Sequence, residues 1–273
     1  MKDENLRKIV RKKYSKIAKE ESSCCGVQST CECGDTPEAK SKKIGYTEEE
    51  LSSIPKGANM GLGCGNPVAL ASLKEGEVVL DLGSGGGFDA FLAAKRVGEH
   101  GKVIGVDMTP EMLEKARANA KKGKFKNVEF RLGEIENLPV ADNSVDIIIS
   151  NCVINLSPDK ERVFNEAHRV LRDGGRVMIS DIVLLEKLPD FLKNSVEALT
   201  GCVAGAMLKD DYIGTIKKAG FKDISTVSES VYPIGSLISD PKVKSAIRKY
   251  KISREQVRNY AKKVVSIKLS GIK

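Results

Sequence analysis

The chain has no tryptophan and only two histidines among its 273 residues, and aromatic residues make up 5% of it. It also lacks a run of about 18 apolar residues, the length that a membrane-spanning helix requires. Its first residues are charged and are not followed by the apolar stretch of a secretory signal. We therefore expect neither a membrane partner nor export, and we expect the protein to act in the cytoplasm.

The shortage of aromatic residues also limits what the net charge of +8 implies. Lysine and arginine are spread over several segments and are not interleaved with aromatic side chains that could stack on bases. We therefore expect a solvated basic surface and no specific nucleic-acid partner. A positive field can still raise the local concentration of an anionic substrate.

Seven cysteines are an odd number for a chain without an export signal. In a reducing compartment, this count favours thiols that bind a metal or take part in chemistry over a disulfide scaffold. The length and the 41% of hydrophobic residues suit one large α/β domain with an appendage.

From Val78 onward, short apolar runs alternate with helical patterns. Alternation of this kind predicts a doubly wound, mostly parallel sheet covered by helices on both faces. The expected strands are 78–82, 103–107, 128–132, 145–150 and 176–183, and the expected helices between them are 88–97, 110–121 and 159–171.

The flanking segments predict an appendage at each end of this core. Before it we expect an amphipathic helix over 2–20, a cysteine-bearing stretch, a mobile linker over 34–46 and a capping-box helix start at Thr47. After it we expect helices near 191–199 and 210–219, a strand over 221–231 and a helix-rich tail over 238–273. The predicted domains are 1–70, an N-terminal helix and cysteine segment; 71–190, the core; and 191–273, a loop, closing strands and a small C-terminal α+β cap with helices.

A glycine-rich loop joins the first predicted strand to the next helix. The segment Asp81-Leu82-Gly83-Ser84-Gly85-Gly86-Gly87-Phe88 lets the backbone approach a ligand closely, and the helix start offers unpaired N–H groups. Phe88 occupies the third glycine position of a dinucleotide fingerprint, so that match is poor. Asp107 ends the second strand, where a carboxylate can accept hydrogen bonds from ribose hydroxyls.

Four features lie in or near this core: the glycine loop, Asp107, the segment Glu134-Ile135-Glu136-Asn137-Leu138-Pro139 and the segment Leu171-Arg172-Asp173-Gly174-Gly175. Together they resemble class I S-adenosylmethionine-dependent methyltransferases over roughly residues 70–185. The resemblance implies a Rossmann-like fold and S-adenosylmethionine as cofactor. It implies that Gly83 and Gly85 pass near the methionine part, that Asp107 binds the ribose and that Glu134 and Ile135 lie at the adenine. The full implied cofactor set is Asp81, Gly83, Ser84, Gly85, Gly87, Asp107, Met108, Glu134, Ile135 and Asn151.

Three isolated cysteines, Cys64, Cys152 and Cys202, each lie in a loop-like setting among small or polar residues. Cys152 directly follows the fourth predicted strand, at the edge of the sheet where cofactors bind. A single cysteine is often a small buried apolar residue. If these three meet beside a cofactor, however, they form a thiolate site for a soft element.

A second resemblance rests on the segments around the three cysteines, 63–67, 150–156 and 201–206, together with the helix around 14–18 and Cys24-Cys25. These segments closely resemble the arsenite methyltransferase family. The resemblance implies methyl transfer to thiolate-bound trivalent arsenic, supplied as arsenite or as arsenic–thiol conjugates. Arsenic held in this way keeps a lone pair and needs no proton removed. The absence of an obvious general base is then expected, because His100 and His168 fall in surface or helix positions.

The same resemblance implies that Cys152 and Cys202 bind arsenic and that Cys64 is a third ligand or a redox partner. It further implies that Cys24 or Cys25 forms a disulfide with Cys64 during turnover, which thioredoxin or a small thiol then reduces. Two other functions stay open at this point: methyl transfer to a quinone-like carbon or oxygen acceptor, and metalloid binding without catalysis. Cys24, Cys25, Cys31 and Cys33 can alternatively bind zinc, although paired Cys-x-x-Cys spacing is missing.

Overall fold

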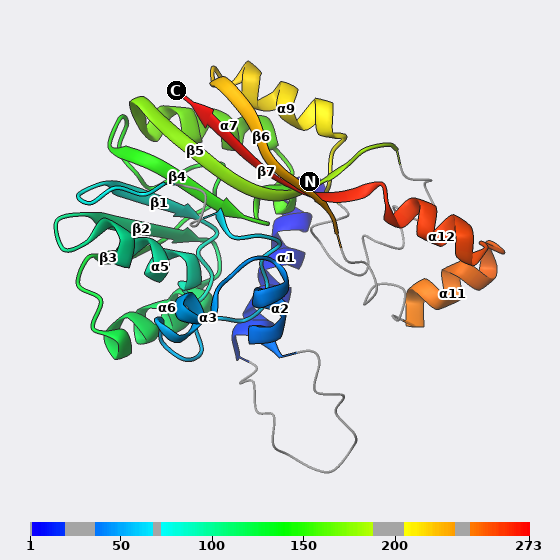
Figure 1. Ribbon diagram of the computed structural model, residues 1–273, viewed down its shortest axis with the longest axis horizontal. Helices are drawn as coiled ribbons and strands as arrows, with labels where there is room; N and C mark the ends of the chain where they lie inside the picture. The colour runs from blue at the N-terminus through cyan, green and yellow to red at the C-terminus, as the bar shows by residue number, and fades with distance from the viewer. Residues whose placement is uncertain (1, 20–35, 68–71, 188–204, 233–240) are drawn as a thin grey trace, which may run out of the picture.

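The computed structural model describes residues 2–19, 36–67, 72–187, 205–232 and 241–273. A seven-stranded sheet in the order β3-β2-β1-β4-β5-β7-β6 forms its centre (Figure 1). The strands are β1 (Val78–Leu82), β2 (Lys102–Asp107), β3 (Val128–Leu132), β4 (Val145–Asn151), β5 (Leu171–Leu184), β6 (Lys222–Val231) and β7 (Val264–Ile272).

The first five strands are parallel, and β1 pairs with both β2 and β4. The chain therefore reverses its direction of winding between β1 and β4. In open α/β sheets, ligands bind outside the carboxyl ends of the strands at such a reversal. The loops that begin at Gly83 and Cys152 both leave the sheet there.

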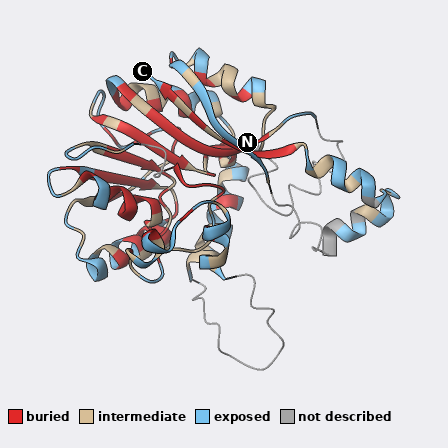
Figure 2. Ribbon diagram, in the orientation of Figure 1, coloured by how far each residue is buried: buried red, intermediate tan, exposed pale blue. Residues whose placement is uncertain are grey.

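Helices cover both faces of the sheet, and each face has its own apolar core. On one face, α5 (Phe88–Val97) and α6 (Pro110–Gly123) bury Phe91 and Leu113. On the other, α7 (Lys160–Val170) and α9 (Lys209–Lys218) bury Phe164 and Tyr212. Figure 2 shows the central strands as the most continuously buried part of the chain, whereas the edge strand β6 is exposed. The predicted doubly wound sheet is confirmed.

The last strand corrects the prediction for the tail. The segment 238–273 was expected to be helix-rich, and α11 (Pro241–Lys249) and α12 (Arg254–Ala261) do lie in it. Residues 264–272, however, form β7, which pairs antiparallel with both β5 and β6. Val265, Ile267 and Leu269 alternate with polar residues, and this period of two is the signal that the lysine-rich composition concealed.

The N-terminal part also differs in one place from the prediction. Helix α1 (Lys2–Lys19) and the capping box of α3 (Glu48–Ser52) at Thr47 are confirmed. The expected linker contains α2 (Pro37–Lys43), whose first turn is capped because the Thr36 hydroxyl accepts a hydrogen bond from the Ala39 N–H at 3.2 Å. The predicted helix near 191–199 lies outside the described residues.

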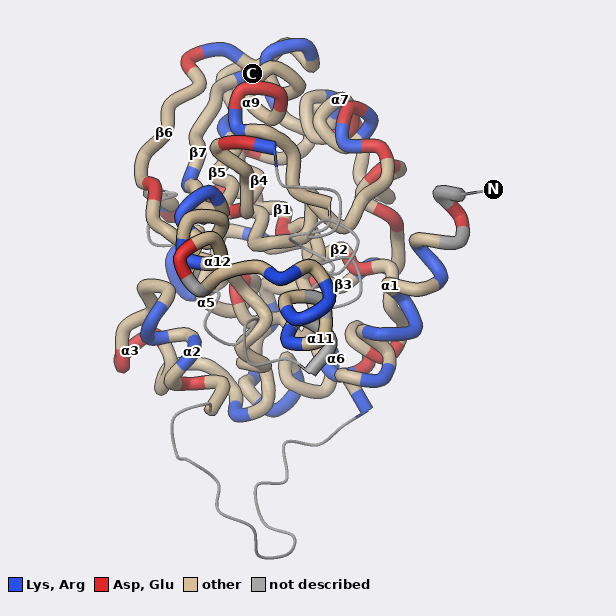
Figure 3. The backbone as a smooth tube through the Cα atoms, turned by 90° about the vertical axis from the view of Figure 1, so that its right-hand side faces the viewer, with Lys and Arg blue, Asp and Glu red and all other residues tan. Residues whose placement is uncertain are grey.

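The C-terminal helices α11 and α12 project from the side of the sheet (Figure 1). Figure 3 shows lysine and arginine on α1, α2, α11 and α12, with acidic segments between the basic ones. Within the described ranges, no helix combines the length and the apolar character needed to cross a membrane.

Candidate active site at the carboxyl end of the sheet

A cleft lies at the carboxyl ends of β1, β2 and β4, and its space together with the solvent at its open mouth is about 1090 Å³. Its walls come from segments far apart in the chain: α1, the loop before β1, the glycine loop, and the turns after β2 and β4. Predicted cofactor residues that line it are Asp81, Gly83, Ser84, Gly85, Asp107, Met108, Ile135 and Asn151, and Cys152 lines it as well.

The glycine loop takes its shape from left-handed backbone at alternate residues. Gly83, Gly85 and Gly87 have φ angles of 66°, 50° and 91°, a region that side-chain-bearing residues rarely adopt. Gly87 then caps the start of α5. At Gly83 a Cβ would lie 2.4 Å from Val153 Cγ2, so this position also needs glycine for the close approach of the turn after β4.

Three carboxylates surround the glycine loop. Asp107 accepts hydrogen bonds from the Gly85 N–H at 3.0 Å and from the Thr109 N–H at 2.8 Å, which fixes it against the loop. Burial raises the pKa of Asp107. Burial also raises the pKa of Asp89, to about 6. Burial, reinforced by the charges of Asp89 and Asp107, raises the pKa of Asp81 well above its ordinary value.

Two polar atoms at the cleft wall have no hydrogen-bond partner within the described part of the chain. They are Asp81 Oδ2 and Ser84 Oγ, and both are buried. Buried polar atoms in native proteins nearly always have partners, so these two are available to a polar ligand in the cleft.

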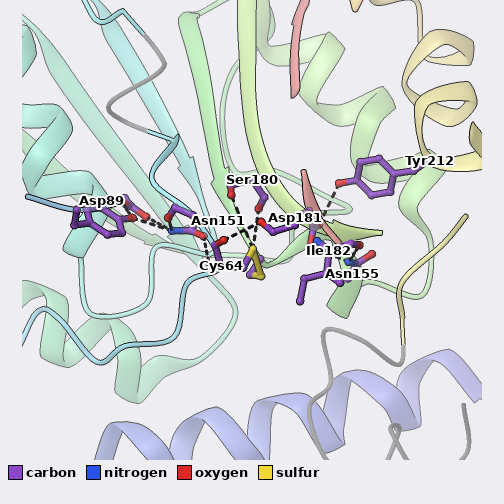
Figure 4. Close-up of a disulfide and its surroundings, with 12 residues drawn as sticks. Cys64, Asp89, Asn151, Asn155, Ser180, Asp181, Ile182 and Tyr212 are labelled. Atoms are coloured by element: carbon purple, nitrogen blue, oxygen red, sulfur yellow. Dashed lines mark hydrogen bonds between the residues drawn. A yellow bond between two sulfur atoms is a disulfide. The ribbon is translucent and has the colours of Figure 1, made fainter. Parts of the chain in front are cut away.

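Next to the cleft, Cys64 and Cys152 are joined by a disulfide, with Cα atoms 5.8 Å apart (Figure 4). Both residues are buried among Ile182 and Val264. Cys152 has a φ of 59°, and its N–H donates to the Ser180 carbonyl at 2.8 Å, which holds the turn after β4 against β5. Thiols 88 residues apart in sequence are thus brought together at the edge of the sheet.

The side chain of Asn151 holds the Cys64 loop in place. Its Oδ1 accepts the Cys64 N–H at 2.9 Å, and its Nδ2 donates to the Gly65 carbonyl at 2.8 Å. The same Nδ2 lies 2.9 Å from both Asp89 Oδ2 and the Tyr46 hydroxyl. One amide therefore links the wall of the cleft to the loop that carries a thiol (Figure 4).

Glycine permits this contact on both sides of Cys64. A Cβ on Gly63 would lie 2.6 Å from Asn151 Nδ2, and one on Gly65 would lie 2.0 Å from Ser180 Oγ. Both positions that flank Cys64 therefore need glycine for this packing.

Comparison with known proteins identifies the framework around this site. Residues 73–220 match the family described as "Methyltransferase domain". The chain belongs to this methyltransferase family. It also has the sheet order and helical layers of the class I methyltransferase fold, as the sequence predicted.

More similar relatives were found among curated proteins and solved structures. The chain is 52% identical over 229 residues to an arsenite methyltransferase of Halobacterium salinarum, and 36% identical over 231 residues to one of Aquipseudomonas alcaligenes. These alignments cover 81% and 82% of this chain but 58% and 64% of the relatives, so the chain spans about three fifths of their length. The crystal structure of an arsenic(III) S-adenosylmethionine methyltransferase from Chlamydomonas reinhardtii is 35% identical, with a TM-score of 0.65, over 86% of this chain and 73% of that one.

Within this methyltransferase domain, the two predicted cofactor residues after β3, Glu134 and Ile135, have different surroundings. Ile135 lines the cleft, and so does its neighbour Glu136. Glu134 instead forms ion pairs with Arg7 at 3.5 Å and Arg11 at 3.3 Å, both from α1. Its placement at an adenine ring stays a prediction.

Helix α1 forms one wall of the methyltransferase cleft, a role that its amphipathic pattern did not indicate. Arg7, Val10 and Tyr14 line the cleft. At the other end of the helix, Ser15 Oγ donates to Glu111 Oε1 at 2.6 Å, and the Lys19 ammonium lies 2.9 Å from the same carboxylate. The helix is therefore fastened to the domain at both ends.

Three of the predicted catalytic cysteines, Cys24, Cys25 and Cys202, lie outside the described residues, as do Cys31 and Cys33. At Gly205, a Cβ would lie 1.9 Å from the Asn155 carbonyl oxygen. Ala206 then packs against the cluster that holds Cys64 and Cys152.

Sequence reasoning missed Asp181, which lies on β5 beside the thiols. One of its carboxylate oxygens and the two sulfur atoms lie within 4.8 Å of one another. Burial raises the pKa of Asp181 to about 6. A polar residue inside an apolar strand, in the segment Met178-Ile179-Ser180-Asp181-Ile182-Val183, is the signal that could have identified it.

Proposed function

We propose that this protein transfers a methyl group from S-adenosylmethionine to trivalent arsenic bound by its cysteine thiolates. The substrate would be arsenite or an arsenic–thiol conjugate. Support comes from the arsenite methyltransferases of Halobacterium and Aquipseudomonas, which match most of this chain, and from the Chlamydomonas structure.

One observation carries the proposal: a buried pair of cysteine sulfurs adjoins the cleft that the glycine loop lines. Cys152 lies in the wall of this cleft together with Gly83 and Gly85. Trivalent arsenic is a soft centre that favours sulfur ligands. A methyltransferase of carbon or oxygen acceptors has no need for two thiols at this position.

The cleft residues fit the cofactor. Asp81 Oδ2 and Ser84 Oγ have no partner among the described residues, and both residues line the cleft. A Cβ added at Gly85 would meet only Met60 Cε, at 3.8 Å, so the loop leaves open space there. When bound, S-adenosylmethionine supplies a methyl group on a positively charged sulfur.

The residues of this chain would then bind and orient the two reactants. We assign the methionine side to the glycine loop, the ribose to Asp107 and the adenine to Ile135. Cys152 and Cys202 would be the arsenic ligands, and Cys64 would be a third ligand that can also be oxidised. Positioning by these groups supplies most of the catalysis, since the acceptor atom carries its own lone pair.

Transfer of a methyl cation to the lone pair would raise arsenic formally from As(III) to As(V). Two cysteine thiols would supply the two electrons that return it to As(III), would become a disulfide and would have to be regenerated. The Cys64–Cys152 disulfide shows that the geometry allows oxidation of this pair. Pairing of Cys64 with Cys24 or Cys25 during turnover stays a prediction. We propose thioredoxin or a small thiol as the reductant, and a reducing compartment such as the cytoplasm as the location, because seven cysteines suit such an environment.

The test is a product analysis with the full chain. The protein is incubated with arsenite, a thiol reductant and methyl-labelled S-adenosylmethionine, and the arsenic species are separated. We expect label in methylated arsenic. Bound cofactor and bound arsenic without any labelled product would contradict the proposal and favour metalloid binding without catalysis. Label transferred to an added quinone but not to arsenic would favour the carbon- or oxygen-acceptor alternative.

A further inference from the structure

Three buried groups of different chemistry meet beside the cleft: the sulfurs of Cys64 and Cys152 and the carboxylate of Asp181. They come from the loop before β1, from the turn after β4 and from β5 (Figure 4). Trivalent arsenic requires only sulfur from such a site, so the chemistry proposed above leaves the carboxylate without a role.

The carboxylate of Asp181 is held in a fixed orientation by its neighbours. Its Oδ1 accepts hydrogen bonds from Asn155 Nδ2 and from the Ile182 N–H, both at 2.8 Å, and its Oδ2 accepts one from the Tyr212 hydroxyl at 3.1 Å. A backbone hydrogen bond from Asn155 also acts on this carboxylate, so it is held beside the two sulfurs. Such outer contacts are typical of carboxylates that bind a metal ion.

Two thiolates and one carboxylate oxygen form a mixed soft and hard donor set. Zinc accepts cysteine sulfur and carboxylate oxygen in the same tetrahedral site, and three protein ligands leave its fourth position open. Magnesium and calcium favour all-oxygen sites and do not suit two sulfurs. The donor set therefore selects a thiophilic divalent cation.

Charge favours the same ion. Two buried thiolates next to a carboxylate would be costly without a compensating cation. A divalent ion reduces the total from three negative charges to one. The ammonium of Lys160 interacts electrostatically with Asp181 and opposes the remaining charge.

We propose that Cys64, Cys152 and Asp181 form a three-ligand zinc site when the two cysteines are reduced. Two electrons from a thiol or phosphine reductant, with two protons from solvent, break the disulfide and give two thiols. Zinc binding then forms two S–Zn bonds and one O–Zn bond and releases the two thiol protons to solvent. Because zinc occupies the same sulfurs as arsenic, it also acts as a reversible inhibitor. This last consequence rests on the proposed function.

The test is a zinc titration of the reduced full-length protein against a chromophoric chelator, with a phosphine as reductant. All samples carry serine at positions 24, 25, 31 and 33, so that the N-terminal cysteines do not contribute. We expect one tightly bound zinc ion. Asp181→Asn, which keeps the size of the side chain and can keep its hydrogen bonds, should weaken zinc binding at least about tenfold.

Asp146→Asn is the matched control, because Asp146 lies at the opposite end of β4 and its carboxylate accepts a hydrogen bond from the Val78 N–H at 2.8 Å. It should leave zinc affinity unchanged. Thermal unfolding verifies that each variant is folded. If Asp181→Asn fails to fold, Cys64→Ser in cobalt-loaded protein replaces it, and the thiolate-to-metal absorption should fall by about half.

Two results would overturn the proposal. One is the absence of stoichiometric zinc in the reduced protein, and the other is an unchanged zinc affinity in Asp181→Asn or an unchanged cobalt spectrum in Cys64→Ser. Arsenite affinity, measured in the same samples, should change less than about twofold in Asp181→Asn, because sulfur alone binds arsenic. Zinc binding is measured without turnover, so its failure is distinguishable from a failure to methylate arsenic.

Discussion

The glycine loop and the thiol pair lie next to each other but are built in different ways. The loop is one continuous segment, Asp81 to Phe88, whose shape follows from backbone conformation at three glycines. The thiol pair joins residues 88 positions apart and is held by side-chain hydrogen bonds, chiefly those of Asn151. One half of the site is local in sequence, and the other is assembled by the fold.

This difference predicts that the two halves can be disabled separately. Substitutions in the cleft should weaken cofactor binding and spare the thiols, whereas substitutions at the thiols should do the reverse. Asn151 and Asp89, which contact each other at 2.9 Å, lie where the two halves meet.

The largest effect is expected from Cys152→Ser. It removes a soft ligand and keeps nearly the same size, so methyl transfer to arsenic should be abolished while the fold is preserved. Calorimetry with S-adenosylhomocysteine should show cofactor-site affinity within about twofold of the parent. Full activity on all trivalent arsenic substrates would show that Cys152 is not a required ligand.

Asp107→Ala tests the other half. The carboxylate lies in the cleft wall and is aligned by two backbone N–H groups. Its loss should weaken cofactor binding by about 1–3 kcal/mol, because charge-assisted hydrogen bonds disappear. Titration calorimetry measures this, and arsenite binding to the reduced thiols serves as the control. A loss of arsenite binding of similar size would mean that the two halves are not separable.

Gly65→Ala tests how closely the Cys64 loop must approach the sheet. The added Cβ would lie 2.0 Å from Ser180 Oγ, so we expect a loss of about 1–3 kcal/mol in the free energy of unfolding. Gly214→Ala is the matched control, since its Cβ meets nothing within 4 Å in helix α9. Denaturant unfolding measures the free energy of unfolding of both variants. Equal values for Gly65→Ala and Gly214→Ala would show that the Cys64 loop is not closely packed against the sheet.

The smallest effect concerns pH and Asp89. Burial raises the pKa of Asp89 to about 6, above the value of an unfolded aspartate. The folded state therefore holds this proton more tightly. The resulting stability is fully present below about pH 4 and is lost as the pH rises through about 6, by about 1–3 kcal/mol in total.

Asp89→Asn removes this titration. The stability of the parent relative to the variant should therefore be greater at pH 4 than at pH 7.5, as measured by urea unfolding at both values. A difference that is independent of pH would show that Asp89 does not titrate in this range.

The sequence was sufficient to predict the sheet, because strands β1 to β5 and their helices follow local apolar periodicity. It was also sufficient to predict the positions of the glycine loop, which follows the first predicted strand, and of Asp107, which ends the second. It was not sufficient for β7, whose alternating pattern is obscured by lysines, or for α2, which depends on a single cap at Thr36. Both elements have few local sequence signals by which they could be predicted.

The thiol half of the site shows a stronger limit. The three isolated cysteines can form a site for a soft element only if they meet, and the structure brings Cys64 and Cys152 together. No pattern in the sequence indicates that Asn151 holds the Cys64 loop or that Asp181 lies beside both sulfurs, because those contacts depend on register between distant strands. The roles of Cys202, Cys24 and Cys25 stay predictions.

The central claim is that these thiols hold trivalent arsenic at the edge of the cleft. X-ray absorption at the arsenic edge, on reduced protein loaded with one equivalent of arsenite, tests it most directly. The account predicts arsenic bonded to at least two sulfur atoms, with one sulfur lost or arsenic released in Cys152→Ser. Arsenic bonded only to oxygen, or a sulfur coordination unaltered by that substitution, would contradict it.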